Sequence, residues 1–170
     1  LFFSNQNVNC SLCHKLRAED APFETFSNYE YHNIGVPRNE DVVALNKLAQ
    51  DFADHGLLEN PLVSDEAMKG KFKVPTLRNI AITGPYMHNG VFKDLRTVVL
   101  FYDKFNNPER SVNPETGQAW GEAEVPETVN LKDLRANVLS DRKVDALVAF
   151  MKLLTDEEYE HLLEQEEAGK

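Results

Sequence analysis

The sequence of 170 residues has few cysteines, few basic side chains and no long apolar run, and each shortage excludes a class of protein. Two cysteines are too few for a disulfide-stapled mini-protein, and the length allows one domain with its own hydrophobic core. No apolar run approaches the roughly 20 residues of a membrane-spanning helix. The 18 Lys and Arg against 28 Asp and Glu give a net charge of −10. This balance argues against nucleic acid as a partner and favours a basic or neutral protein.

Apolar side chains recur at helical spacing in three segments, residues 42–55, 94–104 and 142–154. Asp94 and Ser140 stand where they can cap the second and third of these helices. No segment shows a convincing strand pattern. The sequence therefore predicts an all-α fold with long ordered loops.

Shorter elements are expected between and beyond these helices. A short helix within residues 1–16 leads into the two cysteines, and at most one short helix is expected at 77–82. Residues 106–130 are rich in Pro, Gly, Asn and Glu and predict an irregular surface excursion. Thr155 and Glu158 form a T-x-x-E capping box, which predicts a final acidic helix.

The two ends of the sequence carry further expectations. Seven of the last fifteen residues are acidic, which indicates a solvated helical face or, alternatively, a surface that steers a donor protein by its charge. The sequence begins at Leu1 within an apolar stretch, without an initiator Met or a basic signal segment. We therefore expect that sequence precedes it in the gene product, with a missing amino-terminal domain as one form of that expectation.

Both cysteines belong to one motif. The segment Cys10 to His14 has the sequence Cys-Ser-Leu-Cys-His, the C-x-x-C-H attachment motif of c-type haem. Two thiols three positions apart can bond the two vinyl groups of one porphyrin, and the next residue offers an imidazole to the iron. The alternatives are a redox C-x-x-C, which would need a βαβ context, and half a zinc site, which would need further paired ligands. The motif predicts one covalent haem c.

A haem iron has a second axial position, and the residues alone leave its ligand open. A Met or His is usual in electron-transfer cytochromes, whereas a Tyr suits oxygen chemistry. Met151 lies on the core face of a predicted helix, where packing is the simpler role. The candidates in the sequence are Met68, Met87, Met151, His32, His55, His88 and Tyr102.

Residues 72–80, Phe-Lys-Val-Pro-Thr-Leu-Arg-Asn-Ile, and residues 83–90, Thr-Gly-Pro-Tyr-Met-His-Asn-Gly, closely resemble the bacterial di-haem cytochrome c peroxidase family, including MauG-type enzymes. The resemblance extends from Leu1 to Val144. It implies that residues 1–170 form one cytochrome c-like haem domain, the carboxy-terminal domain of a larger di-haem protein whose amino-terminal domain this chain lacks.

The resemblance also assigns residues. His14 is implied as the proximal ligand and Tyr102, fourteen residues after His88, as the distal ligand of the MauG type. A phenolate lowers the iron potential and stabilises high oxidation states. We expect Arg78 to pair with a haem propionate and His88 to lie at the haem edge. Main-chain oxygens of Thr83 and Pro85 are implied as part of an interdomain Ca²⁺ site.

The expected function follows from the resemblance. The chain would transfer electrons between a donor or substrate and a peroxide-reactive haem. That haem would belong to the amino-terminal domain or to a separate subunit, because this sequence contains no second C-x-x-C-H. Trp120 does not match the tryptophan that lies between the two haems in the family. The implied partner is a small cytochrome, a copper protein or a protein substrate, and the implied location is the bacterial periplasm. The alternative is a single-haem electron-transfer cytochrome with no catalytic step of its own.

Overall fold

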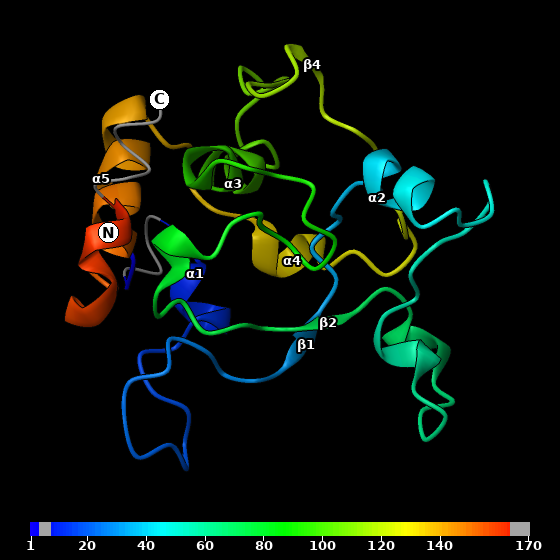
Figure 1. Cartoon of the computed structure of the whole chain (residues 1–170), viewed down its shortest axis with the longest axis horizontal. Helices are drawn as coiled ribbons and strands as arrows, with labels where there is room; N and C mark the ends of the chain where they lie inside the picture. The colour runs from blue at the N-terminus through cyan, green and yellow to red at the C-terminus, as the bar shows by residue number, and fades with distance from the viewer. Residues whose placement is uncertain (4–7, 164–170) are drawn as a thin grey trace.

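The computed structural model describes residues 1–3 and 8–163, and it combines short helices with long connecting segments (Figure 1). None of the helices in these residues is long and apolar enough to cross a membrane. The α-helices are α1 (Cys10–Cys13), α2 (Glu40–Leu45), α3 (Leu95–Asp103), α4 (Leu131–Leu134) and α5 (Asp141–Lys152). Single 3₁₀ turns cover Leu57–Glu59, Glu66–Met68, Ile80–Ile82 and Glu157–Tyr159.

The structure corrects the prediction that the chain contains no strands. Strand β1 (Tyr31–His32) pairs antiparallel with β2 (Phe72–Lys73), and β3 (Val112–Asn113) pairs antiparallel with β4 (Gln118–Ala119). Strands of two residues are too short to show the alternation by which strands are recognised in a sequence. The β1–β2 pair joins two distant segments and forms one side of the central region of the molecule (Figure 1).

The two longest helices, α3 and α5, pack against each other and confirm two of the predicted helices. The Asp94 carboxylate accepts a hydrogen bond from the Arg96 amide at 2.7 Å, so the predicted cap of α3 is present. Ser140 occupies the N-cap position of α5, but its side chain makes no capping bond; its carbonyl accepts from the Val144 amide instead. The core between and around these helices includes the fully buried Phe92, Phe101 and Val144.

The predicted helix over residues 42–55 is much shorter in the structure. Helix α2 ends at Leu45, and Lys47 follows with a left-handed φ of 55°. The side chain of Leu45 is 82% exposed, so no packed neighbour covers the apolar face that the sequence pattern defines. Isolated short helices are marginal without such packing, which explains the early end.

The predicted final acidic helix begins as a 3₁₀ turn at residues 157–159 and is helical over residues 160–163, but the predicted Thr155 capping box is not formed. Asp156, and not Thr155, precedes the 3₁₀ turn Glu157–Tyr159, and the Thr155 hydroxyl is buried without a hydrogen-bond partner. The Asp156 carboxylate accepts hydrogen bonds from Arg78 and Asn79, which ties this turn to the loop before α3. Three of the seven acids counted in the sequence, Glu164, Glu166 and Glu167, lie outside the described residues.

Trp120, the single tryptophan, has a packing role. Its ring lies edge-on to Phe92 and Phe101, with centroid distances of 5.7 and 5.8 Å. Its indole N–H donates to the Arg110 carbonyl at 2.6 Å, so the polar end of the ring is satisfied. The excursion over residues 106–130 is thereby fastened to α3.

A buried carboxylate fixes the carboxy-terminal end of α3. The Asp103 side chain has no exposed surface and accepts from the Leu139 amide at 2.9 Å, from Asn107 Nδ2 at 3.1 Å and from Arg110 Nε at 3.3 Å. Arg110 also bonds Asp141 at the start of α5 at 2.9 Å. Because a buried charge needs partners of this kind, Asp103 ties α3, the 106–130 excursion and α5 together.

Replacing Asp103 by Ala should lower the free energy of unfolding by about 3 to 5 kcal/mol, because the change leaves the buried Leu139 amide and one side of Arg110 without their acceptor. Asp145, exposed on α5 and bonded to Arg96, is the matched control. Asp145→Ala should change the free energy by less than about 1 kcal/mol. Denaturant unfolding measures both, and equal effects of the two substitutions would contradict the role given to Asp103.

Candidate functional site

A cavity of about 570 Å³ in the middle of the molecule brings the predicted site residues together. Its wall includes Cys10, Cys13, His14 and Tyr102, which come from α1, the residue after it, and α3. The volume falls in the usual range for cofactor pockets. The structure therefore places the C-x-x-C-H motif and the predicted distal Tyr on one cavity, although they lie far apart in the sequence.

Helix α1 sets the geometry of the motif. The amide of His14 donates to the Cys10 carbonyl at 2.9 Å, which closes one helical turn and leaves both thiols and the imidazole on the same cavity. The His14 Nδ1 lies 3.0 Å from the Phe26 carbonyl. Hydrogen bonding of Nδ1 to a carbonyl is the arrangement that orients a histidine to bind a metal through Nε2.

Burial is the main influence on the ionisation of the three motif side chains. It lowers the pKa of the His14 imidazole, although bonds to the carbonyls of Phe26 and Pro75 oppose that shift. Burial also raises the pKa of the Cys10 and Cys13 thiols to about 11. A neutral imidazole can bind a metal ion, and both cysteines are free thiols and not a disulfide.

Tyr102 belongs to the face of α3 that forms the cavity wall. Leu95, Val98 and Val99 line the cavity with it, as the helical spacing predicts. Burial raises the pKa of the Tyr102 phenol far above its ordinary value, and the nearby thiols Cys10 and Cys13 add to the shift. A phenolate at this position would therefore need a cation, which is what a bound metal ion supplies.

The cavity narrows the set of candidates for the second axial position. His32, His88, Met87 and Met151 line it together with Tyr102, whereas Met68 and His55 do not. Met151 lies in the core that joins α3 and α5 and is 7% exposed, in keeping with packing. Met87 has a left-handed φ of 70°, an uncommon conformation for a residue with a side chain of this kind.

The two predicted haem-edge residues lie on the cavity wall with partners of their own. The Arg78 guanidinium bonds Asp156 at 2.6 Å, and both side chains are 41% exposed. This is an exposed ion pair, and pairing of Arg78 with a propionate stays a prediction. The His88 ring stacks on Phe72 with ring centroids 3.5 Å apart. Partial burial lowers the pKa of His88, and the negative charge of Asp54 opposes this shift.

Thr83 and Pro85 also line the cavity. The Thr83 hydroxyl donates to the Ile80 carbonyl at 3.3 Å. Among residues 1–3 and 8–163, no group of three or more His, Cys, Asp or Glu side chains is placed to hold a metal ion. The predicted Ca²⁺ site uses main-chain oxygens and an outside ligand, so it stays a prediction.

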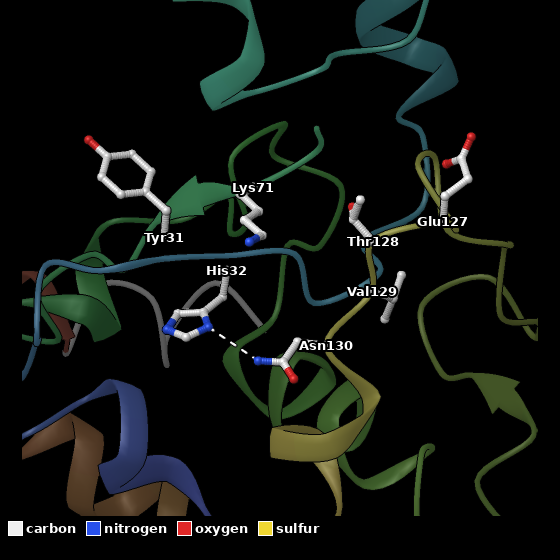
Figure 2. A pocket seen from close by; sticks show the side chains of 7 residues that line it. All are labelled: Tyr31, His32, Lys71, Glu127, Thr128, Val129 and Asn130. Atoms are coloured by element: carbon white, nitrogen blue, oxygen red, sulfur yellow. Dashed lines mark hydrogen bonds between the residues drawn. The ribbon is translucent and has the colours of Figure 1, made fainter. Parts of the chain in front are cut away.

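A second, polar pocket of about 450 Å³ adjoins the cavity (Figure 2). It is formed by β1, by Lys71 just before β2 and by residues 127–130, and it shares His32 and Asn130 with the cavity. No sequence pattern indicates this pocket, because three separate segments supply its wall. Figure 2 shows the His32 ring directed toward Asn130, whose Nδ2 lies 3.4 Å from His32 Nδ1. The pocket is lined by Tyr31, His32, Lys71, Glu127, Thr128, Val129 and Asn130.

The residues present fit a covalent haem. Two free thiols, an imidazole with its Nδ1 held and a phenol share one cavity of cofactor size. The cavity wall also carries a buried nitrogen, His32 Nε2, that has no hydrogen-bond partner within the described residues. Fold and site together define a helix-and-loop domain with a c-type haem attachment motif on its central cavity.

Comparison with known proteins places the chain in a family. No family model matches it. Over 166 residues, 95% of the chain, it is 54% identical to the methylamine utilization protein MauG of Paracoccus denitrificans, and it covers 43% of that protein. The chain belongs to the family of MauG and the di-haem cytochrome c peroxidases.

Solved structures agree with this assignment. The diheme peroxidase BthA of Burkholderia thailandensis matches with a TM-score of 0.72 and 30% identity, over 94% of this chain and 41% of that one. A MauG-like protein associated with microbial copper homeostasis matches with a TM-score of 0.60 and 26% identity, over 92% of this chain and 45% of that one. The chain spans less than half the length of these relatives.

Replacing Cys10 and Cys13 together by Ala should abolish covalent haem attachment, because both thioether bonds are lost while His14 remains. Intact mass after coexpression with cytochrome maturation factors should show one haem on the unaltered chain and none on the double variant. Ser11→Ala, inside the same motif, is the control and should keep the haem. An unaltered chain that emerges colourless and without added mass would show that the motif does not bind haem.

Proposed function

We propose that this chain is the carboxy-terminal haem c domain of a di-haem protein of the MauG and cytochrome c peroxidase type. The observation that supports it best is that Cys10, Cys13, His14 and Tyr102 line one cavity. The two thiols would anchor the porphyrin, the imidazole would be the proximal ligand, and the phenol would be the distal ligand. Family membership supports the same assignment.

Haem bound in this cavity supplies one-electron redox chemistry at its iron. The chain's own residues set the conditions for that chemistry. The Phe26 carbonyl holds His14 in the orientation for binding. Helix α3 holds Tyr102 on the wall of the same cavity, where only a cation stabilises its anionic form. The apolar residues of α3 that share the wall keep water from the site and so strengthen electrostatic interactions within it.

The part of the protein beyond this chain would hold the peroxide-reactive haem. Electrons would pass between a donor or substrate and that second haem through the haem of this domain. The relatives' length supports this division, since this chain covers only 41 to 45% of each of the three proteins compared. A periplasmic location follows from covalent haem in bacteria and is part of the same proposal.

The remaining assignments complete this proposal. Main-chain oxygens of Thr83 and Pro85 would supply part of a Ca²⁺ site to which the other domain adds ligands, since carbonyl oxygens suit that hard cation. The net charge of −10 supports a basic or neutral surface on the small cytochrome, copper protein or protein substrate that exchanges electrons with this domain.

A second candidate is a single-haem electron-transfer cytochrome with no catalytic step of its own. One observation favours it: Met87 lines the same cavity, and a thioether ligand raises the iron potential as carrier proteins require. Near-infrared magnetic circular dichroism separates the candidates, because only thioether ligation gives the corresponding charge-transfer band. That band in the unaltered protein would favour Met87 and the second candidate.

Replacing Tyr102 by Phe should open the distal position or recruit another ligand, because the ring remains and only the phenol oxygen is lost. The electron paramagnetic resonance spectrum of the ferric protein should change, with haem content unaltered. Tyr159, partly exposed outside the cavity, is the matched control, and Tyr159→Phe should leave the spectrum as it was. An unchanged spectrum in Tyr102→Phe would refute the distal assignment.

A further inference from the structure

His32 carries a polar atom for which the protein supplies no partner. Three buried side-chain nitrogen or oxygen atoms of the described residues lack a hydrogen bond: His32 Nε2, Arg38 Nε and Thr155 Oγ1. Of these three residues, only His32 lines the cavity. A buried donor without a partner is unfavourable, so such an atom on a cofactor cavity indicates an acceptor from outside the protein.

The surroundings of His32 determine which nitrogen carries the hydrogen. Asn130 Nδ2 lies 2.7 Å from Asp133 Oδ2 and 3.4 Å from His32 Nδ1, while Asn130 Oδ1 accepts from the Asp133 amide at 3.3 Å. These contacts identify the amide nitrogen of Asn130, which can only donate. His32 Nδ1 is therefore the acceptor, and the hydrogen of the neutral ring lies on Nε2.

The unpartnered atom is thus a donor, and its nearest recorded acceptor is too far for a hydrogen bond. Glu30 Oε2 lies 3.6 Å from Nε2, on a side chain that is 62% exposed and accepts from Asn28 at 2.9 Å. The His32 side chain itself is only 17% exposed. Its N–H is therefore available to a group that enters the cavity.

Three other nitrogen-bearing side chains of the cavity wall have recorded contacts of their own. Arg78 is paired with Asp156 at 2.6 Å. The Lys73 ammonium lies over the Tyr29 ring, 4.7 Å from its centroid, and the His88 ring stacks on Phe72. A carboxylate brought into the cavity would find in His32 a buried donor that needs no existing bond to be broken.

We propose that His32 binds a haem propionate by donating its Nε2 hydrogen to the carboxylate. The inference rests on the proposed function, because the propionate belongs to the haem anchored at Cys10 and Cys13. The polar pocket beside His32 has Lys71, Thr128 and the exposed Glu127 on its wall, so the ring lies at a polar part of the cavity wall (Figure 2). His32 is then a haem-positioning residue and not an iron ligand.

Two substitutions of His32 separate the two ring nitrogens. His32→Gln places an amide N–H near the position of Nε2 and should keep the bond to the propionate. In His32→Asn the side-chain amide extends only to the position of Nδ1, so it can still contact Asn130 but should lose the hydrogen bond to the propionate. The exposed His161, with its Nδ1 3.1 Å from the Glu158 carbonyl, is the control through His161→Ala.

Resonance Raman spectroscopy of the haem-loaded full chain measures the propionate bending band, which moves to lower frequency when a hydrogen bond is lost. We expect that shift in His32→Asn and no shift in His32→Gln or His161→Ala. An unmoved band in His32→Asn overturns the proposal. A changed axial-ligand pattern in the electron paramagnetic resonance spectrum of His32→Asn also overturns it, since His32 would then bind the iron. Absence of haem from the unaltered chain would instead refute the proposed function.

Discussion

The packing of α3 against α5, fixed by the buried Asp103 carboxylate, is the constraint on which the rest of the structure depends. Asp103 follows Tyr102 directly, so the contacts that hold its carboxylate to the Leu139 amide and to Arg110 also hold the phenol on the cavity wall. A helix of nine residues has little stability of its own and takes its position from such contacts. The position of Tyr102 in the site therefore depends on the contacts of Asp103.

Burial suppresses the ionisation of the side chains that meet at the cavity. The thiols of Cys10 and Cys13 and the phenol of Tyr102 have raised pKa values, and the pKa of His14 is lowered, so all four side chains favour their neutral forms without a metal ion. Covalent attachment of the proposed haem would convert both thiols to thioethers, and its iron would supply the positive charge that a phenolate requires. Burial thus favours a neutral donor set, and only a bound cation would stabilise the anionic form of Tyr102 there.

Sequence reasoning identified what depends on local spacing and missed what depends on distant contacts. The C-x-x-C-H motif and the face of α3 with Tyr102 can be read from local spacing, and both lie on the cavity. The helix expected to His55 ends at Leu45 because nothing packs on its apolar face, and spacing cannot reveal that. From the sequence His32 is only a candidate iron ligand, because its bond to Asn130 spans 98 positions and exists only in the folded chain.

The haem count of the particle purified from its native host tests the central claim most directly, namely that this chain is one haem domain of a di-haem protein. Intact mass and haem stoichiometry should show two haems per particle, and mass spectrometry of the peptide that contains Cys10 to His14 should locate one of them there. A particle with a single haem, or a haem absent from that peptide, would contradict the account.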